Sequence, residues 1–168
     1  MKKLFLAATA ALAVLSLSPA EAAEKNIGFF GSWSVWQYSD AGGKGCFIYA
    51  NPSKAEPARL NHGLVSFFIR SVGKSPPRTE ASLQFGYAVD PNGPSWLSVD
   101  GKKFRLQTYK SGAWLAGGKP RERDLLKAMK SGRSMRVSTA SRRGNETHYV
   151  FPLNGVTRAM GLLRRRCS

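Results

Sequence analysis

Two cysteines are the residues of this chain whose chemistry is easiest to predict. Cys46 and Cys167 are the only cysteines among its 168 residues, and Cys167 is the last residue but one. Two cysteines in an oxidising compartment allow a single intramolecular disulfide. We therefore predict a Cys46–Cys167 bond that closes most of the chain into one loop. A free, reactive thiol is the alternative.

Arginine and lysine side chains form three clusters of a kind that can bind an anion. The first lies in or just before a predicted helix, the second in a predicted hairpin turn, and the third at the end of the chain. The clusters are Arg121, Arg123, Lys127 and Lys130; Arg142 and Arg143; and Arg164, Arg165 and Arg166. The guanidinium fork matches phosphate and carboxylate groups. We predict anionic-ligand binding by these nine residues, with a solvated surface that aids solubility as the alternative.

Motifs for catalysis or metal binding are missing from the sequence. Neither His62 nor His148 has a second ligand at a metal-binding spacing, and the HExxH, CxxC and GxSxG patterns are absent. Most acidic residues fall in predicted turns or helix starts, and Glu122 and Asp124 are expected in a first helical turn, where negative charge is favourable. We predict no catalytic residue, no metal and no cofactor. A glycosidase-like carboxylate pair stays open, because such residues pair in space rather than in sequence.

Residues 1–22 have the pattern of a cleaved secretory signal peptide. Two lysines precede an apolar stretch over residues 4–17, and Ala20-Glu21-Ala22 offers small residues at the positions that a signal peptidase reads. The apolar stretch is shorter than the roughly 20 residues that a membrane span needs. We predict cleavage after Ala22 and a single exported, β-rich domain over residues 23–168.

The chain is strongly basic, with 26 Lys and Arg against 10 Asp and Glu and a net charge of +16. Removing the predicted signal peptide takes away two basic residues and one acidic residue, which leaves +15. Such a charge favours anionic partners. For an exported protein we expect anionic lipid, lipopolysaccharide, a glycan or another envelope protein as the partner, and we expect no nucleic acid.

Alternating apolar residues predict a series of short strands. They are expected near residues 31–38, 46–49, 63–71, 80–89, 96–99, 102–109, 113–116, 133–139 and 146–153. Asp100-Gly101 stands between two of them and is a strong hairpin signal, because both positions of such a turn need positive φ. Residues 51–62 contain two prolines and are expected to be an irregular connection.

Two short helices complete the expected elements. Pro120 suits the start of the first helix, and Gly132 suits its end. Asn154 is expected to cap the second helix, and Arg164–Arg166 then lie at its negative end. The apolar sides of the helices carry Leu125, Leu126 and Met129, and Val156, Met160 and Leu163. Short connections between strands predict a mainly β fold: an antiparallel β-sandwich or barrel-like domain with about two short helices.

The tryptophans offer a possible contact surface for a sugar or a lipid. Aromatic residues at alternating strand positions usually belong to the core instead. Trp33 and Trp36 cannot both face the same side of a regular strand, because their spacing is odd. Of the two, Trp36 is the better candidate for an exposed contact.

Four groups of short motifs stand in a fixed order along residues 23–168. They are Gly31-Ser32-Trp33-Ser34-Val35 with Cys46; Val99-Asp100-Gly101 with Phe104, Leu106 and Ala113-Trp114; Ala128-Met129-Lys130-Ser131-Gly132 with Met135, Val137, Ser141, Gly144 and Thr147; and Leu153-Asn154-Gly155 with Ala159 and Cys167. This ordered set resembles the invasion-associated locus B family of exported bacterial proteins. The resemblance implies a β-rich protein in the periplasm or at the surface of a Gram-negative bacterium, and it carries over no catalytic residues.

Taken together, these features favour an exported, non-enzymatic envelope or surface protein. We expect it to bind an anionic envelope or host component through a basic surface. The alternative is a periplasmic hydrolase that acts on an envelope polymer.

Overall fold

The structure is a computed structural model, and it describes residues 23–40, 43–73 and 78–167. The elements of these residues are β1 (Ala23–Phe30), β2 (Trp33–Asp40), β3 (Gly43–Ala50), β4 (Lys54–Glu56), β5 (Ser66–Val72), β6 (Arg78–Gln84), β7 (Trp96–Val99), β8 (Lys102–Tyr109), β9 (Gly112–Leu115), α1 (Gly118–Ser131), β10 (Ser134–Ala140), β11 (Glu146–Pro152) and α2 (Val156–Cys167). The predicted signal peptide lies outside the described residues.

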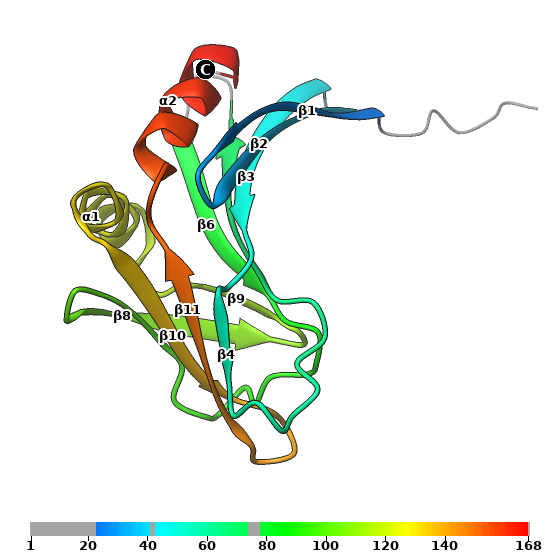
Figure 1. Cartoon of the computed structure of the whole chain (residues 1–168), viewed down its shortest axis with the longest axis vertical. Helices are drawn as coiled ribbons and strands as arrows, with labels where there is room; N and C mark the ends of the chain where they lie inside the picture. Colours follow the sequence, from blue (N-terminus) through cyan, green and yellow to red (C-terminus); the bar gives the residue numbers. More distant parts are fainter. Residues whose placement is uncertain (1–22, 41–42, 74–77, 168) are drawn as a thin grey trace, which may run out of the picture.

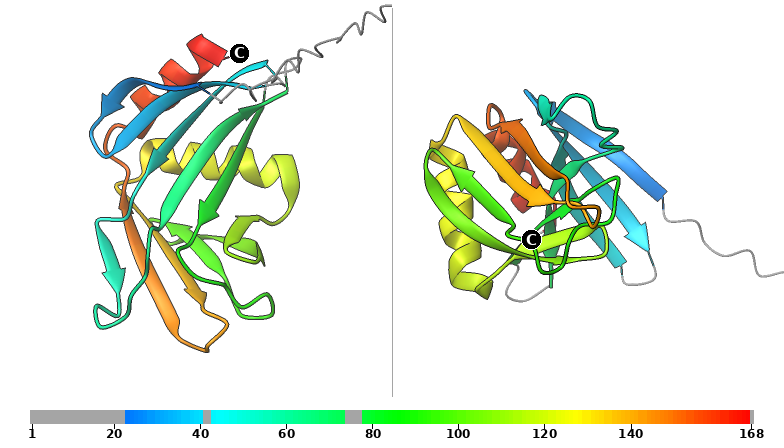
Figure 2. Two further views of the ribbon diagram at one scale, coloured as in Figure 1. Left: turned by 90° about the vertical axis from the view of Figure 1, so that its right-hand side faces the viewer. Right: turned by 90° about the horizontal axis from the view of Figure 1, so that it is seen from below.

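The eleven strands of the described residues form one antiparallel sheet in the order β1-β2-β3-β5-β6-β9-β8-β7-β10-β11-β4. Strand β8 joins its two halves: Lys102–Arg105 pair with β7, and Leu106–Tyr109 pair with β9. The sheet therefore bends at β8 and curls around a shared interior (Figure 2). Strands β1 and β4 are its two free edges. The predicted mainly β, antiparallel fold with two helices is confirmed.

One apolar core fills the inside of the bent sheet and joins the first strands of the chain to the last. Phe67 packs edge-on against both Trp33 and Phe151, with ring centroids 6.1 Å apart in each pair. The indole N–H of Trp33 also donates a hydrogen bond to the Pro152 carbonyl oxygen at 3.0 Å. These contacts fix β2 against β11 across the interior.

Helix α2 lies at one end of the molecule, and α1 lies between α2 and the middle of the molecule (Figure 1). Leu125 and Met129 of α1 are completely buried in the core. Helix α2 buries an apolar side made of Val156, Ala159, Met160 and Leu163. Neither helix in the described part of the chain has the length and apolar composition needed to cross a membrane.

The ends of the helices differ in part from the predictions. Gly132 ends α1 as expected, and its N–H bonds to the Ala128 carbonyl at 2.8 Å. Helix α1 begins at Gly118, so the prediction that Glu122 and Asp124 lie in its first turn is wrong. Asn154 does not take its predicted capping role, because its Oδ1 accepts a hydrogen bond from Ser32 Oγ at 2.9 Å, and α2 begins only at Val156.

The strand predictions agree best with the structure next to turns whose residues strongly favour a hairpin. Asp100 and Gly101 both have positive φ, 44° and 87°, in the predicted hairpin between β7 and β8. Two strands were not predicted: β1, which pairs with β2, and the three-residue β4, which lies inside the expected irregular connection. The strand predicted over residues 80–89 ends at Gln84, although Phe85 and Val89 beyond it are still buried.

Candidate anion-binding groove

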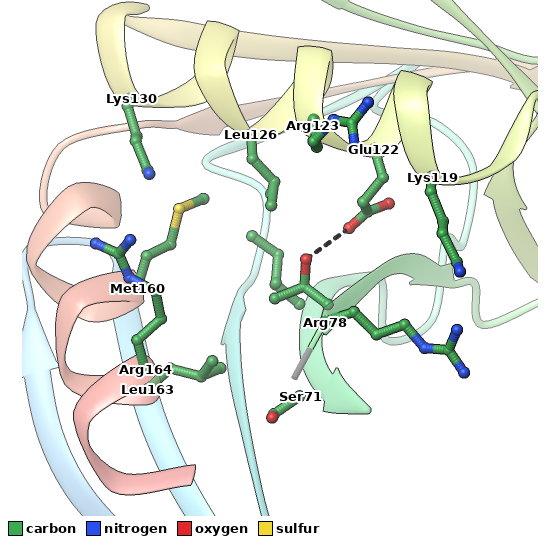
Figure 3. A pocket seen from close by; sticks show the side chains of 12 residues that line it. Ser71, Arg78, Lys119, Glu122, Arg123, Leu126, Lys130, Met160, Leu163 and Arg164 are labelled. Carbon is green, nitrogen blue, oxygen red and sulfur yellow. Dashed lines mark hydrogen bonds between the residues drawn. The ribbon is translucent and has the colours of Figure 1, made fainter. Parts of the chain in front are cut away.

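Helices α1 and α2 and strands β5 and β6 enclose a groove that contains part of the predicted basic surface (Figure 3). Its volume is about 390 Å³, within the range of roughly 300–1,000 Å³ common for small-molecule sites. Three of the nine predicted anion-binding residues line it: Arg123, Lys130 and Arg164. The fold therefore brings together members of the first and the third basic cluster.

Five cationic side chains surround this groove. Arg78 comes from β6, Arg164 from α2, and Lys119, Arg123 and Lys130 from α1. The α1 residues are four and seven positions apart, a spacing that places them on one face of the helix. All five are exposed, and no ion pair found in the described part of the chain involves any of them. Their charges are therefore available to a ligand.

The floor of the groove is apolar. It consists of Ile69 from β5, Leu126 from α1, and Met160 and Leu163 from α2. Ile69 and Leu163 are almost fully buried, at 0% and 2% exposure, so the floor is continuous with the core. Leu126 is half-buried and points into the groove (Figure 3). The site thus combines a buried apolar floor with exposed charged side chains at its rim.

Glu122 is the carboxylate of the groove. Its Oε1 accepts a hydrogen bond from the Thr79 hydroxyl at 3.3 Å. Burial raises the pKa of Glu122, because the charged form loses solvation, and this outweighs the hydrogen bonds that it accepts from Ala81 and Thr79. The proximity of Glu80 adds to the increase in the pKa. The groove therefore holds a carboxyl group that takes up a proton more readily than an exposed glutamate.

The five cations are not spread evenly over the groove. Lys130 and Arg164 lie beside Met160 at the α2 end (Figure 3). Arg78 and Lys119 lie at the opposite end, next to Glu122 (Figure 3). One end of the groove is therefore purely cationic in the described residues that line it, while the other end has a mixed charge.

A disulfide fixes the helix that supplies half of this site. Cys46 in β3 is bonded to Cys167 at the end of α2, with Cα atoms 5.7 Å apart, as predicted. The Ser71 hydroxyl, from β5, also donates a hydrogen bond to the Cys167 carbonyl at 2.8 Å. Both contacts hold α2 against the sheet. The bond indicates an oxidising location outside the cytoplasm.

The other predicted anion-binding residues lie elsewhere. Arg121 donates a hydrogen bond to the Lys103 carbonyl at 3.1 Å and stacks over the ring of Phe104, so it has a structural role. Three more are exposed in α1 and at the end of α2 but do not line the groove: Lys127, Arg165 and Arg166. Arg142 and Arg143 line a separate hollow beside the β10–β11 turn, at the other end of the molecule (Figure 1).

Two groove cations were missed from the sequence. Lys119 continues the spacing of Arg123 and Lys130 toward the N-terminus of α1, so a helix predicted to start two residues earlier would have included it. Arg78 stands at the start of β6, and nothing in its local sequence indicates which helix the strand will face.

Both histidines are held by hydrogen bonds. His148 bonds to Ser138 Oγ at 3.0 Å on the neighbouring strand, as expected for a sheet residue. His62 bonds through Nδ1 to the Tyr149 hydroxyl at 2.8 Å and through Nε2 to the Pro57 carbonyl at 3.1 Å. Within the described ranges, no group of three His, Cys, Asp or Glu residues is arranged to hold a metal ion.

The bonds of His62 continue into a buried polar network. Tyr149 bonds to the Tyr87 hydroxyl at 2.9 Å, and Tyr87 bonds to Thr147 Oγ1 at 2.6 Å. Burial raises the pKa of both tyrosines. This network joins the 57–62 connection to β11 beneath the hollow that contains Arg142 and Arg143.

Trp36 belongs to an aromatic layer on the outer face of β2, β3 and β5. It stacks on Phe47 with an interplanar angle of 6°, and Phe47 in turn contacts Tyr49 and Phe68. Trp33, by contrast, is 1% exposed in the core. The prediction that these two tryptophans face opposite sides of the strand is confirmed.

Comparison with solved structures identifies a protein of the same architecture. The crystal structure of invasion associated protein B from Bartonella henselae superposes on 82% of this chain and on 95% of its own, with a TM-score of 0.57 and 16% sequence identity. The chain has the fold of that protein. The resemblance that the ordered motifs predicted is thereby confirmed at the level of the fold. No protein-family model and no curated protein matches the chain.

Proposed function

We propose that the chain is an exported, non-enzymatic envelope protein that binds an anionic envelope or host component through the groove between α1 and α2. The observation that carries this proposal is the convergence of five cations from three elements on one groove. Cations that share a concave surface raise the local concentration of anions. The predicted net charge of +15 after export adds a long-range attraction of the same sign.

A binding role is favoured over hydrolysis by the state of the acidic residues. Three carboxylates are engaged by neighbouring cations: Glu56 with Lys54 at 2.6 Å, Glu80 with Arg70 at 2.9 Å, and Asp124 with Arg121 at 3.6 Å. Glu122 faces the groove without a second described carboxylate among the residues that line it. A two-carboxylate hydrolysis mechanism needs such a pair.

The proposed location is the periplasm or the surface of a Gram-negative bacterium, reached through the predicted signal peptide. The disulfide and the fold shared with invasion associated protein B support this location. Fractionation of cells that express the full chain tests it. Recovery in the cytoplasmic fraction with an uncleaved N-terminus would contradict it.

Charge reversal in the groove tests the binding role. The variant Arg123→Glu/Lys130→Glu should lose binding to lipopolysaccharide and to vesicles with anionic lipid, while the wild type binds both and binding weakens as salt is raised. Arg142→Glu/Arg143→Glu is the matched control, because it makes the same change in charge at the other end of the molecule. Equal losses in both variants would show a dependence on net charge alone and would contradict the groove.

A further inference from the structure

The groove offers two kinds of surface to a ligand, and each needs a different partner. Its rim is cationic, but its floor is made of aliphatic side chains and one thioether. A small hydrophilic anion would satisfy the rim and leave the exposed part of the apolar floor, chiefly Leu126, in contact with water. Covering apolar surface is favourable in proportion to the area removed from water. A ligand that matches the whole groove therefore has an apolar part as well as an anionic part.

We propose that the occupant of the groove is an anionic amphiphile with a single acyl chain. The chain lies over Leu126, Met160 and Leu163, and the carboxylate or phosphate head group binds between Lys130 and Arg164. This inference rests on the proposed function, because it names the class of anion that the groove takes.

The distribution of charge selects the end that holds the head group. Lys130 and Arg164 flank the α2 end without a carboxylate among the described lining residues, whereas Glu122 lies beside Arg78 and Lys119 at the other end (Figure 3). An anion placed next to Glu122 would be repelled unless that carboxyl group took up a proton. The head group therefore favours the α2 end, and Arg164 can bind it through two parallel N–H bonds.

The volume of the groove and the side chains of its floor favour a ligand with a single acyl chain. A cavity of about 390 Å³ is at the small end of the range of roughly 300–1,000 Å³ for small-molecule sites, which argues against a lipid with two long chains. Met160, which is 5% exposed, is unbranched and adapts its shape to irregular apolar partners. The disulfide fixes α2, so the floor is formed before a ligand arrives.

A chain-length series tests this proposal on the exported chain with its disulfide intact. The probes are n-alkyl carboxylates and single-chain lysophosphatidic acids of increasing length, the corresponding n-alkanols, and inorganic phosphate. Binding is measured by calorimetry below the micellar concentration and by the NMR shift of the Met160 methyl group. Each added methylene should strengthen binding about three- to fourfold until the groove is full. Preference for one of the two acid series identifies the head group, and either preference supports the proposal.

Variants separate the head-group site from the rest of the rim. Lys130→Ala/Arg164→Ala should weaken binding of a ten-carbon carboxylate at least about tenfold, since two charged hydrogen-bonding partners are lost. Lys130→Arg/Arg164→Lys should restore most of the affinity. Arg142→Ala/Arg143→Ala, the matched pair outside the groove, should leave affinity within about twofold of the wild type. Circular dichroism and thermal melting show whether each variant is folded.

Several outcomes would overturn the proposal. Alkanols that bind as tightly as carboxylates would show an apolar site without a head-group requirement. Inorganic phosphate that binds as tightly as the amphiphiles, or affinity that does not change with chain length, would show a site for hydrophilic anions; the proposed function would then stand and this inference would fail. Absence of binding to every anion, including lipopolysaccharide, would overturn both.

Discussion

The Thr79 hydroxyl donates a hydrogen bond to Glu122 Oε1 across 3.3 Å and thereby ties strand β6 to helix α1 inside the groove. Because burial raises the pKa of Glu122, protonation of this carboxyl group stabilises the folded state. This stabilisation is complete below the ordinary pKa of 4.5 and is lost as the pH rises through the higher pKa of the folded state.

The first prediction concerns Glu122→Gln, which keeps an acceptor for Thr79 but cannot ionise. The variant should be more stable than the wild type at pH 7, and the difference should shrink toward zero below pH 4.5. Urea unfolding at the two pH values measures it. A difference that is independent of pH would contradict the assigned cause, the burial of a charge.

The same substitution should change ligand binding. At pH 7 it removes a negative charge from the groove, so an alkyl sulfate, whose charge is constant over this pH range, should bind more tightly to the variant than to the wild type. Lowering the pH toward 4.5 should strengthen binding to the wild type and leave the variant almost unchanged. Parallel pH profiles for the two proteins would place the anion out of reach of Glu122.

The second prediction concerns the disulfide, which joins residues 121 positions apart. Replacing both cysteines with alanine should lower the free energy of unfolding by about 4–5 kcal/mol, because the unfolded chain gains the entropy of an open loop. Urea unfolding of the variant and of the oxidised wild type measures the difference, and alkylation followed by mass spectrometry counts thiols. Two alkylatable thiols in the native exported protein would refute the bond.

The third prediction separates the two histidines. His62→Phe keeps an aromatic ring against Tyr149 but removes both hydrogen bonds of the imidazole, so it should destabilise the protein by about 1–3 kcal/mol. His148→Phe removes a single bond at a half-buried strand position and should cost less than about 1 kcal/mol. Equal costs in denaturant titrations would mean that the polar network around Tyr149 adds little to stability.

The fourth prediction concerns Gly155, the residue before α2. It has a φ of 92°, and a Cβ atom there would collide with the Phe30 carbonyl oxygen. Gly155→Ala should therefore destabilise by about 2–5 kcal/mol, the sum of left-handed strain and overpacking. Gly144→Ala is the control: its φ is 79° with nothing within 4 Å of the added atom, so only strain of about 1–2 kcal/mol applies. The two melting temperatures should differ accordingly, and equal melting temperatures would exclude the collision.

The parts of the fold that could be predicted from the sequence are those that local chemistry determines. Asp100-Gly101 forms its hairpin because few other dipeptides tolerate positive φ at both positions. Strand β1 escaped prediction because its sequence, AEKNIGFF, lacks alternation, and its pairing with β2 shifts register between Asn26 and Gly28. Its extended shape is a consequence of pairing with a neighbour.

In residues 80–89, the alternation of buried residues continues beyond the end of the strand. Ala81, Leu83, Phe85 and Val89 are all buried at alternating positions, but the strand ends at Gln84. The chain bends at Gly86, where the backbone of Gly63 lies too close for a side chain. Burial can be predicted from alternation, whereas this bend arises from a contact between segments far apart in the sequence.

A basic ligand-binding surface was predictable from the sequence, but the residues that form it were not. A basic helix face and a basic C-terminus were recognisable, but which members meet is decided by how α1 crosses β6 and α2. Arg78 lines the site because of that packing, whereas Lys119 was missed because α1 begins two residues before its predicted start. Arg121 has a structural role over Phe104. Tertiary geometry of this kind leaves no local trace in the sequence.

The position of Cys167 sets an order of events during biosynthesis. Cys46 is synthesised and translocated before Cys167. Its thiol therefore has no partner until the 121st residue after it has emerged. With no third cysteine in the sequence, that thiol has no wrong partner within its own chain. Oxidation can therefore close the disulfide only after the segment that contains Cys167 has emerged, and a chain truncated before Cys167 cannot form it.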